Sequence, residues 1–459
     1  MAPVNRTDQL PRLLPGTAAT LNLDEHLARY GPLPLRPAGD LIAEVRAAGL
    51  TGRGGAAFPA GTKLAAVAAA AAAAARPRAG HRRRTAAAAF IVANGVESEP
   101  GSGKDAVLLA RSPHLVLDGI AVAARATGAS RAWLCLPADK PRLAGQLREA
   151  IAARARAGAS SVPVLVEAIP GGYLASQESA LVSWLSGGSQ QPSFVPPRPA
   201  DQGVRGRPTL VQNAETLAHL ALIARYGAAW FRTVGVPPEA GSALVTVTGA
   251  VPHPGVLETP LGTPLGTVLA QAGLHPAGGR RGTSQHGPAR RPQAVLAGGY
   301  LGGWLAWPDA ADVPVSAAGL RRAGAALGPG TLAVLPAAAC GLAQTARILA
   351  WLAGQRAGQC GPCTHGLPAL AEAFAQIAFA RPHPDTLGWA SQLTQLLPGR
   401  GACYLPDGGA GLAVSALRVF AKDLRWHAGH GPCPPAIRAA RSEERRVGKE
   451  CRSRWSPYH

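Results

Sequence analysis

The chain of 459 residues is long enough for about two to four domains, and 47% hydrophobic against 16% charged residues excludes a wholly disordered protein. Its formal net charge is +20, but the Arg residues are scattered or lie in short runs beside Pro and Gly, so we expect no nucleic-acid partner. No apolar stretch approaches the ~20 residues of a membrane-spanning helix, and no secretory signal pattern is present. We therefore expect a cytoplasmic protein without direct membrane insertion.

The first half of the chain predicts an α/β domain. Residues 1–40 are Pro-rich and irregular, and we expect an N-terminal strap there. A helical pattern from Asp40 ends at a glycine-dense loop, after which we expect a buried strand at 86–93, helices over 105–126 and a second strand at 132–136. Alternating strand and helix patterns indicate a mostly parallel sheet covered by helices, here over 41–237.

In the second half of the chain, the predicted secondary structure changes first to strands and then to helices. Short alternating strands, at 243–248 and 294–297, predict a small β-rich domain over 241–328. Within it, 276–292 is largely Gly, Arg, Pro and Ser, and we expect an excursion without a fixed fold. Apolar residues spaced three and four apart then predict helices at 346–353, 367–377 and 411–426, in a helical domain over 335–435.

The last segment, 441–459, is a sudden charged stretch. It looks like the translation of a common sequencing-adaptor oligonucleotide, and we interpret it as an artefactual tail. The alternative is a natural basic tail. Under either interpretation we assign no chemistry to Cys451 or Trp455.

The glycine-dense loop at 51–63 is the first candidate site. Closely spaced glycines let backbone N–H groups approach a phosphate, and Lys63 adds a positive charge within reach. The spacing fits neither the Rossmann fingerprint nor the Walker pattern, and a plain tight turn is the alternative. Polar residues from Asn94 onward follow the next predicted strand, and an open α/β sheet holds its ligand at the carboxyl ends of strands.

Cys360 and Cys363 are the second candidate site. Their spacing is that of the thioredoxin redox pair, but in that fold the motif follows a strand, whereas a helical stretch precedes it here. With Cys403 they supply three thiolates for iron–sulfur or zinc, one fewer than the usual four. Unrelated buried cysteines are the plain alternative.

Six ordered blocks of the sequence match one family. They are GLTGRGGAAFPAGTK at 49–63, ANGVESEPG at 93–101, GGYLASQESAL at 171–181, GRPTLVQNAETL at 206–217, VTGAVPHPGV at 247–256 and GQCGPCTHGLP at 358–368. The chain resembles the flavoprotein subunit that oxidises NADH in bacterial respiratory complex I, the NADH-quinone oxidoreductase, and its relatives in soluble hydrogenases and formate dehydrogenases. The resemblance implies a Rossmann-like FMN-binding domain, a β-grasp domain of the SLBB type and a C-terminal helical bundle with an iron–sulfur site.

The resemblance also implies residue roles around the flavin. Cofactor-binding positions fall on Gly52, Arg53, Gly54, Gly55, Phe58, Lys63, Asn94, Glu97, Glu99 and Asn213. The family carries two adjacent acids beside the flavin and the nicotinamide, where this chain has Gln177 and Glu178, so Glu178 is the catalytic candidate. Further departures from the family pattern are Val96, Ser176 and Gln212.

The positions that bind the nicotinamide nucleotide depart further from the family pattern than the flavin positions do. Of the family's phenylalanines that stack the NADH adenine, Phe58 is present, but the other two positions hold Ala66 and Arg198. An aromatic pair contributes ~0.5–1.5 kcal/mol beyond area burial, so we expect nicotinamide affinity about one to two powers of ten lower. Arg198 could instead pair with a 2′-phosphate.

The predicted iron–sulfur site also departs from the family pattern. The family holds a 4Fe–4S cluster with Cys-x2-Cys-x2-Cys and a distant Cys, and the first position here is Ala357, which leaves Cys360, Cys363 and Cys403 as ligands. The site could carry a cluster with one open or oxygen-ligated iron, could use Cys340 or His365 as a substitute, or could be empty.

We therefore predict an electron-transfer flavoprotein that passes electrons from a reduced nicotinamide through FMN to an iron–sulfur cluster and an unknown acceptor. It would work with other redox subunits and could lie peripheral to a membrane complex. The alternative is a non-catalytic or repurposed paralogue that serves as a flavin-binding or scaffold module. A thiol oxidoreductase using Cys360 and Cys363 is a third interpretation, which a strand directly before Cys360 would support.

Overall fold

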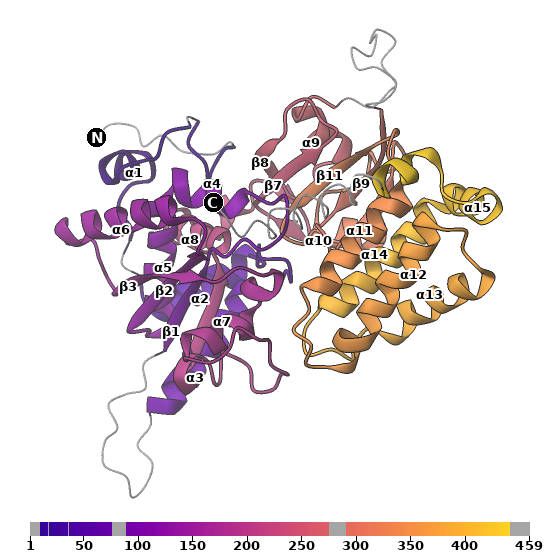
Figure 1. Cartoon of the computed structure of the whole chain (residues 1–459). Coiled ribbons are helices and arrows are strands. Elements are labelled where there is room, and N and C mark those ends of the chain that lie inside the picture. The colour runs from indigo at the N-terminus through magenta and orange to yellow at the C-terminus, as the bar shows by residue number, and fades with distance from the viewer. Residues whose placement is uncertain (1–9, 17, 35, 76–88, 275–290, 441–459) are drawn as a thin grey trace, which may run out of the picture.

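The computed structural model describes residues 10–16, 18–34, 36–75, 89–274 and 291–440. Figure 1 shows a parallel sheet wrapped by helices, then a second sheet, then a group of helices at the carboxyl end. This order confirms the predicted fold class. The predicted tail at 441–459, nearly all of the predicted excursion at 276–292 and the start of the strand predicted at 86–93 lie outside the described residues.

The first sheet is parallel, and its strands lie in the order β3-β2-β1-β4. The strands are β1 (Phe90–Asn94), β2 (Arg131–Pro137), β3 (Val164–Ile169) and β4 (Thr209–Asn213). Successive side chains of β1 enter different cores, since Ile91 and Ala93 pack in one and Phe90 and Val92 in the other. A strand buried on both faces needs the continuous apolar run that the sequence shows.

Helices cover both faces of this sheet. They are α1 (Leu23–Tyr30), α2 (Ala38–Ala48), α3 (Ala60–Ala75), α4 (Lys104–Arg111), α5 (Pro113–Thr127), α6 (Pro141–Arg156), α7 (Glu178–Leu185) and α8 (Ala214–Phe231). Gly119 of α5 lies against the Leu217 carbonyl of α8, where a Cβ would clash, so this glycine sets the close approach of the two helices. The expected irregular strap is wrong in part, because α1 forms there behind an Asn22–Glu25 capping box.

The second sheet is mixed, in the order β10-β9-β11-β7-β8. Its strands are β7 (Ser242–Gly249), β8 (Gly255–Pro260), β9 (Pro292–Ala297), β10 (Gly303–Ala306) and β11 (Thr331–Pro336). The same region contains helices α9 (Leu265–Gln271) and α10 (Ala317–Arg322). A small hairpin of β5 (Gly235–Val236) and β6 (Glu239–Ala240) precedes the sheet in the chain. Strands β7 and β11 are parallel neighbours at the centre, and the other pairs are antiparallel. This is the arrangement of a β-grasp domain.

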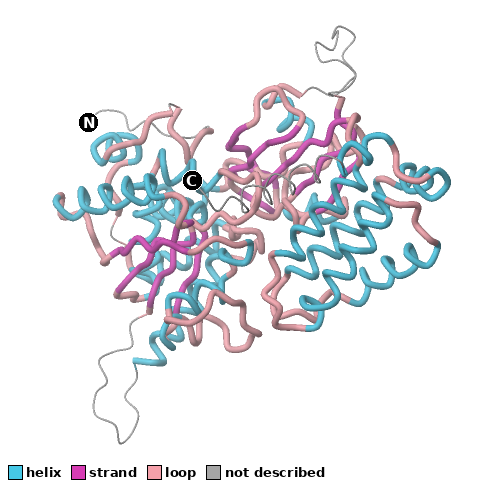
Figure 2. Tube along the Cα trace, viewed as in Figure 1, coloured by secondary structure: helices cyan, strands magenta, loops and turns pink. Residues whose placement is uncertain are grey.

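The carboxyl-terminal region consists of helices and loops in Figure 2. The helices are α11 (Gly341–Gly354), α12 (Leu367–Phe379), α13 (Pro384–Leu396), α14 (Leu405–Val419) and α15 (Ala421–His430). The single helix predicted over 411–426 is wrong, because the chain breaks between α14 and α15 at Phe420. The Phe420 ring is buried against Trp304 at this break, with ring centroids 5.3 Å apart.

Among the described helices, none alone is long and apolar enough to cross a membrane. Helices α4 and α5 pass that test only as a pair, and they are bent by 96° relative to each other. Nearly every residue of α5 is buried, as its packing under the parallel sheet requires.

Candidate functional site

The carboxyl edge of the parallel sheet brings distant segments together. Strands β1 and β4 are neighbours in register, and they end side by side at Asn94 and Asn213. The strand order reverses between β1 and β4, since β2 and β3 both lie on the other side of β1. Such a reversal is where an open α/β sheet leaves a crevice for its ligand.

The glycine-dense loop lies over this edge. A Cβ on Gly54 would come 3.2 Å from Cβ of Asn213, a tight contact, so glycine favours this close approach of the loop to the strand end. Gly55 has φ 118°, a conformation that favours glycine, and pairs with Gly328 of the β-grasp domain through an isolated bridge. The Gly52 N–H donates to the Phe58 carbonyl at 2.9 Å, which closes the loop.

Arg53 points inward, away from the loop surface. Its side chain is buried and its guanidinium donates to the Ser242 carbonyl at 3.1 and 3.2 Å and to the Thr51 carbonyl at 2.8 Å. Its backbone N–H donates to Oγ1 of Thr216 at 2.8 Å. Arg53 therefore anchors the loop to β7 and α8.

Lys63 and Glu178 form an ion pair between α3 and α7, with Nζ 2.9 Å from Oε1. Both side chains are partly exposed, at 21% and 35%. Lys63 lies in the first turn of α3 and Glu178 begins α7. The preceding Gln177 caps α7, because its side-chain oxygen accepts from the Ala180 N–H at 2.9 Å.

The start of α7 is tied to the end of β1. Asn94 Nδ2 donates to the Ser176 carbonyl at 2.8 Å, and the Ser98 and Ser176 hydroxyls lie 2.6 Å apart. Because Ser176 is two residues from Glu178, these bonds fix the ion pair beside the strand ends. The structure thus brings together the loop glycines, Lys63, Glu178 and the two strand-end asparagines.

Glu97 and Glu99 serve other contacts. Glu97 caps α4, with its carboxylate accepting from the Asp105 and Ala106 N–H groups at 3.2 Å. Glu99 is buried and accepts from the Tyr173 hydroxyl at 2.6 Å and from the Tyr300 N–H at 2.9 Å, which links the first domain to the β-grasp domain. Burial raises the pKa of Glu99 to about 7 even though both bonds oppose the shift.

A buried charge network beneath the strand ends was not predicted. Lys104 is 1% exposed, and its Nζ lies 2.9 Å from Asp105, 2.8 Å from Glu215 and 3.4 Å from Oδ1 of Asn213. Burial alone would raise the pKa of Glu215, but Lys104, His219 and Arg53 lower it to about 2. The sequence does show these charged residues within predicted helices. Amphipathic spacing, however, leads one to expect charged side chains on the solvent face of a helix.

The positions of the family's adenine-stacking rings are open to solvent. Phe58 is 48% exposed, and Ala66 and Arg198 are also exposed. Phe194, four residues before Arg198, is 60% exposed. Two exposed aromatic rings are therefore present in the segments that the resemblance assigns to the nucleotide.

The three predicted metal-ligating cysteines come together ahead of two helices. Cys360 and Cys363 lie at the turn before α12, Cys403 precedes α14, and all three thiols are free. Burial raises the pKa of Cys403, and the nearby Cys363 and Cys360 raise it further. Ala357 is half-buried at the family's first ligand position.

The two substitutes considered for the fourth ligand differ in their surroundings. His365 is exposed, and the Cys340 sulfur contacts His427 instead, 3.8 Å from its Nε2. The thioredoxin interpretation fails on its own criterion, because helix α11 and the loop 355–359 precede Cys360 in the described structure.

The residues at both sites suit the groups that the resemblance implies. Lys63 offers an ammonium for a phosphate. Asn94 Nδ2 has a second N–H besides the one that bonds the Ser176 carbonyl, whereas Asn213 Nδ2 donates to both Asp105 and the Asn94 carbonyl and so supports the strand ends. Three thiols suit three irons of a four-iron cluster, whereas the methyl group of Ala357 cannot ligate the fourth.

Family models match all three regions of the chain. They are the Nuo51 FMN-binding domain over 45–222, the SLBB domain over 244–290 and the NADH-ubiquinone oxidoreductase-F iron-sulfur binding region over 338–427. The chain is therefore a flavoprotein of the class that combines an FMN-binding domain, an SLBB domain and an iron–sulfur region.

Relatives identify the family within that class. The NADH-quinone oxidoreductase-F protein of Mycobacterium tuberculosis is 30% identical over 407 residues, 87% of this chain and 86% of that protein. The Streptomyces coelicolor protein of the same name is 30% identical over 404 residues, 86% of this chain and 84% of that protein. The chain belongs to the NADH-quinone oxidoreductase-F family.

A solved structure is similar in fold. It is that of an NAD+-reducing [NiFe]-hydrogenase in the air-oxidised state, with a TM-score of 0.70 and 30% sequence identity over 86% of this chain. The similarity covers 63% of the hydrogenase chain, so this chain spans less than two thirds of that protein.

Proposed function

We propose that the chain accepts electrons from a reduced nicotinamide nucleotide at FMN and delivers them through an iron–sulfur group to another redox subunit. The observation that carries the proposal is the meeting of the glycine loop, Lys63, Glu178, Asn94 and Asn213 at the point where the sheet order reverses. FMN supplies the conversion between two-electron and one-electron transfer.

Different residues would bind the flavin and the nicotinamide. Lys63 and the loop around Gly54 would hold the flavin phosphate, and Asn94 would donate to the ring system, with Asn213 supporting the strand end beside it. Glu178 would hold the nicotinamide beside the flavin. In the present structure Glu178 pairs with Lys63, so a bound phosphate would compete with this carboxylate for the ammonium.

Nicotinamide binding is expected to be weak. Phe58 is the remaining aromatic ring of the family's three, and the exposed Arg198 replaces another. Phe194 offers an exposed ring in the same segment. Arg198 also favours a nucleotide with an additional phosphate, since a guanidinium pairs with phosphate in a bidentate manner.

Cys360, Cys363 and Cys403 would hold the iron–sulfur group, with Ala357 leaving one iron without a cysteine. The relatives are named as a subunit of an NADH-quinone oxidoreductase and as an NAD+-reducing hydrogenase, which supports a place beside other redox subunits. A position peripheral to a membrane complex agrees with this assembly.

The test uses full-length chain reconstituted anaerobically with FMN, iron and sulfide. We expect flavin fluorescence to be quenched on binding and NADH or NADPH to reduce an artificial dye. Glu178→Gln should keep FMN binding, since it frees Lys63, but should lower kcat/KM for the nicotinamide about 10–100-fold, because a hydrogen bond to a charged group contributes about 1.5–3 kcal/mol. Glu149→Gln, an exposed substitution on α6, is the matched control.

Two failures have different meanings. Protein that takes up no FMN at saturating concentration would refute the flavin site itself. FMN binding without reduction of dye by either nucleotide would leave the flavin site intact and favour the non-catalytic, flavin-binding paralogue.

A further inference from the structure

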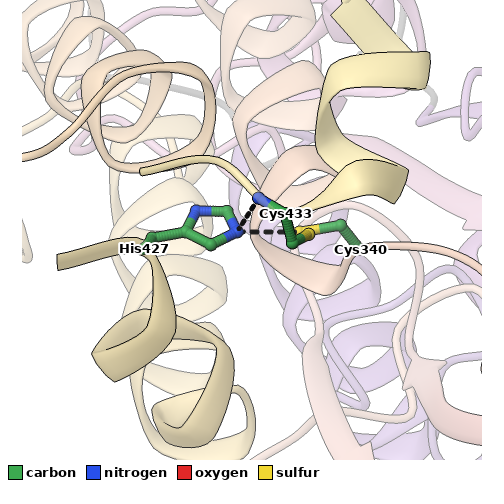
Figure 3. A group of neighbouring side chains, drawn as sticks. All are labelled: Cys340, His427 and Cys433. Carbon is green, nitrogen blue, oxygen red and sulfur yellow. Dashed lines mark hydrogen bonds between the residues drawn. The ribbon is translucent and has the colours of Figure 1, made fainter. Parts of the chain in front are cut away.

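A second group of potential metal ligands lies in the helical region, apart from the three cysteines described above. This Cys–His–Cys cluster consists of Cys340, His427 and Cys433, whose ligand atoms all lie within 4.8 Å of one another (Figure 3). Cys340 is the N-cap of α11, His427 lies in α15, and Cys433 follows α15. Cys340 and His427 are buried and Cys433 is half-buried.

The spacing of the cluster suits a single tetrahedral ion. Zinc–sulfur bonds of about 2.3 Å and zinc–nitrogen bonds of about 2.0 Å at tetrahedral angles set sulfur and nitrogen about 3.5 Å apart and two sulfurs about 3.8 Å apart. Cys340 Sγ lies 3.8 Å from His427 Nε2. With every pair inside 4.8 Å, side-chain shifts of about 1 Å or less would complete the geometry.

The histidine is already oriented as a ligand. His427 Nδ1 lies 2.9 Å from the Ile377 carbonyl, to which it can only donate, so this ring nitrogen carries the proton. The Cys433 N–H donates to Nε2 at 3.2 Å, so Nε2 carries the lone pair that a metal needs, and an ion bound there replaces this hydrogen bond. A carbonyl bonded to the far nitrogen is the usual support of a metal-binding histidine, because it fixes the tautomer and the ring.

The surroundings of the sulfurs also favour a cation. The Ala343 N–H donates to Cys340 Sγ at 3.5 Å, at the N-terminus of α11, where negative charge is stabilised. Asp423 lies one helical turn before His427 in α15. The site therefore combines two thiol sulfurs, an imidazole lone pair and a nearby carboxylate.

We propose that the Cys–His–Cys cluster binds one Zn2+, with water in the fourth position. Each thiol releases its proton to solvent as its sulfur–zinc bond forms, so two protons leave for each ion bound. Two thiolates and one imidazole, with water in the fourth position, are a ligand set that binds zinc in proteins. The ion ties α15 and the following turn to the start of α11, where the β-grasp domain joins the helical region.

The test isolates this site by replacing the other candidate ligands. In a full chain carrying Cys360→Ser, Cys363→Ser, Cys403→Ser and Cys451→Ser, stripped with chelator, incubated with Zn2+ and desalted, elemental analysis should find about one zinc per chain. Adding Cys340→Ser, His427→Gln or Cys433→Ser should lower the retained zinc at least tenfold. Cys135→Ala, a buried thiol on β2, is the matched control and should retain zinc.

A second measurement keeps the proposal testable if a ligand variant fails to fold. With the three ligands intact, Co2+ should give sulfur-to-metal charge-transfer bands and the intense absorption of tetrahedral cobalt, and Zn2+ should protect Cys340 and Cys433 from alkylation in peptide mapping. A chain that retains no zinc, zinc that persists in all three ligand variants, or a Cys340–Cys433 disulfide detected by mass spectrometry would overturn the proposal.

Discussion

Lys104→Met probes the buried charge network beneath the strand ends. Methionine keeps the packing of the Lys104 stem but leaves Asp105 and Glu215 buried without the ammonium that lies 2.9 and 2.8 Å from them. Breaking a buried ion pair from one side costs about 3–5 kcal/mol. Because Arg53 remains 3.9 Å from Glu215, we expect the lower end, about 3 kcal/mol.

Thermal unfolding followed by circular dichroism measures this loss. A domain of about 200 residues loses about 2–4 °C in Tm per kcal/mol, so Tm at pH 7 should fall by about 6–12 °C. Lys140→Met removes an exposed lysine and should change Tm little. Adding Glu215→Gln to Lys104→Met should recover part of the loss, because it removes one unpaired charge.

The stability that this charge network contributes should depend on pH. The folded pKa of Glu215 is lowered to about 2 from an ordinary 4.5, so its stabilisation is present above about 4.5 and is lost as pH falls toward 2. The gap in stability between wild type and Lys104→Met should therefore narrow from pH 5 to pH 3. A loss no larger than that of Lys140→Met, or a double variant less stable than Lys104→Met, would refute the reasoning.

Three further outcomes are expected. Because the folded pKa of Glu99 is raised to about 7, ionisation of Glu99 destabilises the fold as pH rises from about 4.5 to 7. Glu99→Gln should therefore raise Tm at pH 8 but not at pH 4. An equal gain in Tm at both pH values would contradict this. Ala357→Cys should raise iron after reconstitution to about four per chain, and unchanged iron would count against the cluster geometry. Arg198→Phe should lower KM for NADH about 2–10-fold through ring stacking without lowering that for NADPH, as checked by dye reduction; a parallel fall for both nucleotides would argue against a phosphate contact at Arg198.

Local patterns were sufficient to predict what depends on neighbouring residues. The apolar run that forms β1, the polar Asn94 at its end and the glycines around Gly54 each carry their signal within a few positions. The parallel sheet followed from the alternation of strands and helices. The helix break at Phe420 was missed because the apolar spacing continues across it, and the contact of Phe420 with Trp304 is distant in the sequence.

Side-chain direction and long-range clusters could not be predicted from spacing. Arg53 stands among loop glycines, but its guanidinium is bound to Ser242, 189 positions away in the chain. Glu97 and Glu99 belong to one motif, yet one caps a helix and the other links two domains. The meeting of Cys340 with His427 spans 87 positions, and no local period signals such an encounter.

The pairing of β1 with β4 has a consequence for biosynthesis. Asn94 and Asn213 are 119 positions apart, and three strands of the sheet leave the ribosome before the fourth. A nascent chain that ends before β4 lacks the strand end beside Asn94, and forming a contact between residues so far apart in the sequence is slow. We expect coenzyme capture to begin only once the residues of α8 have been translated, so that flavin uptake reports completion of the first domain.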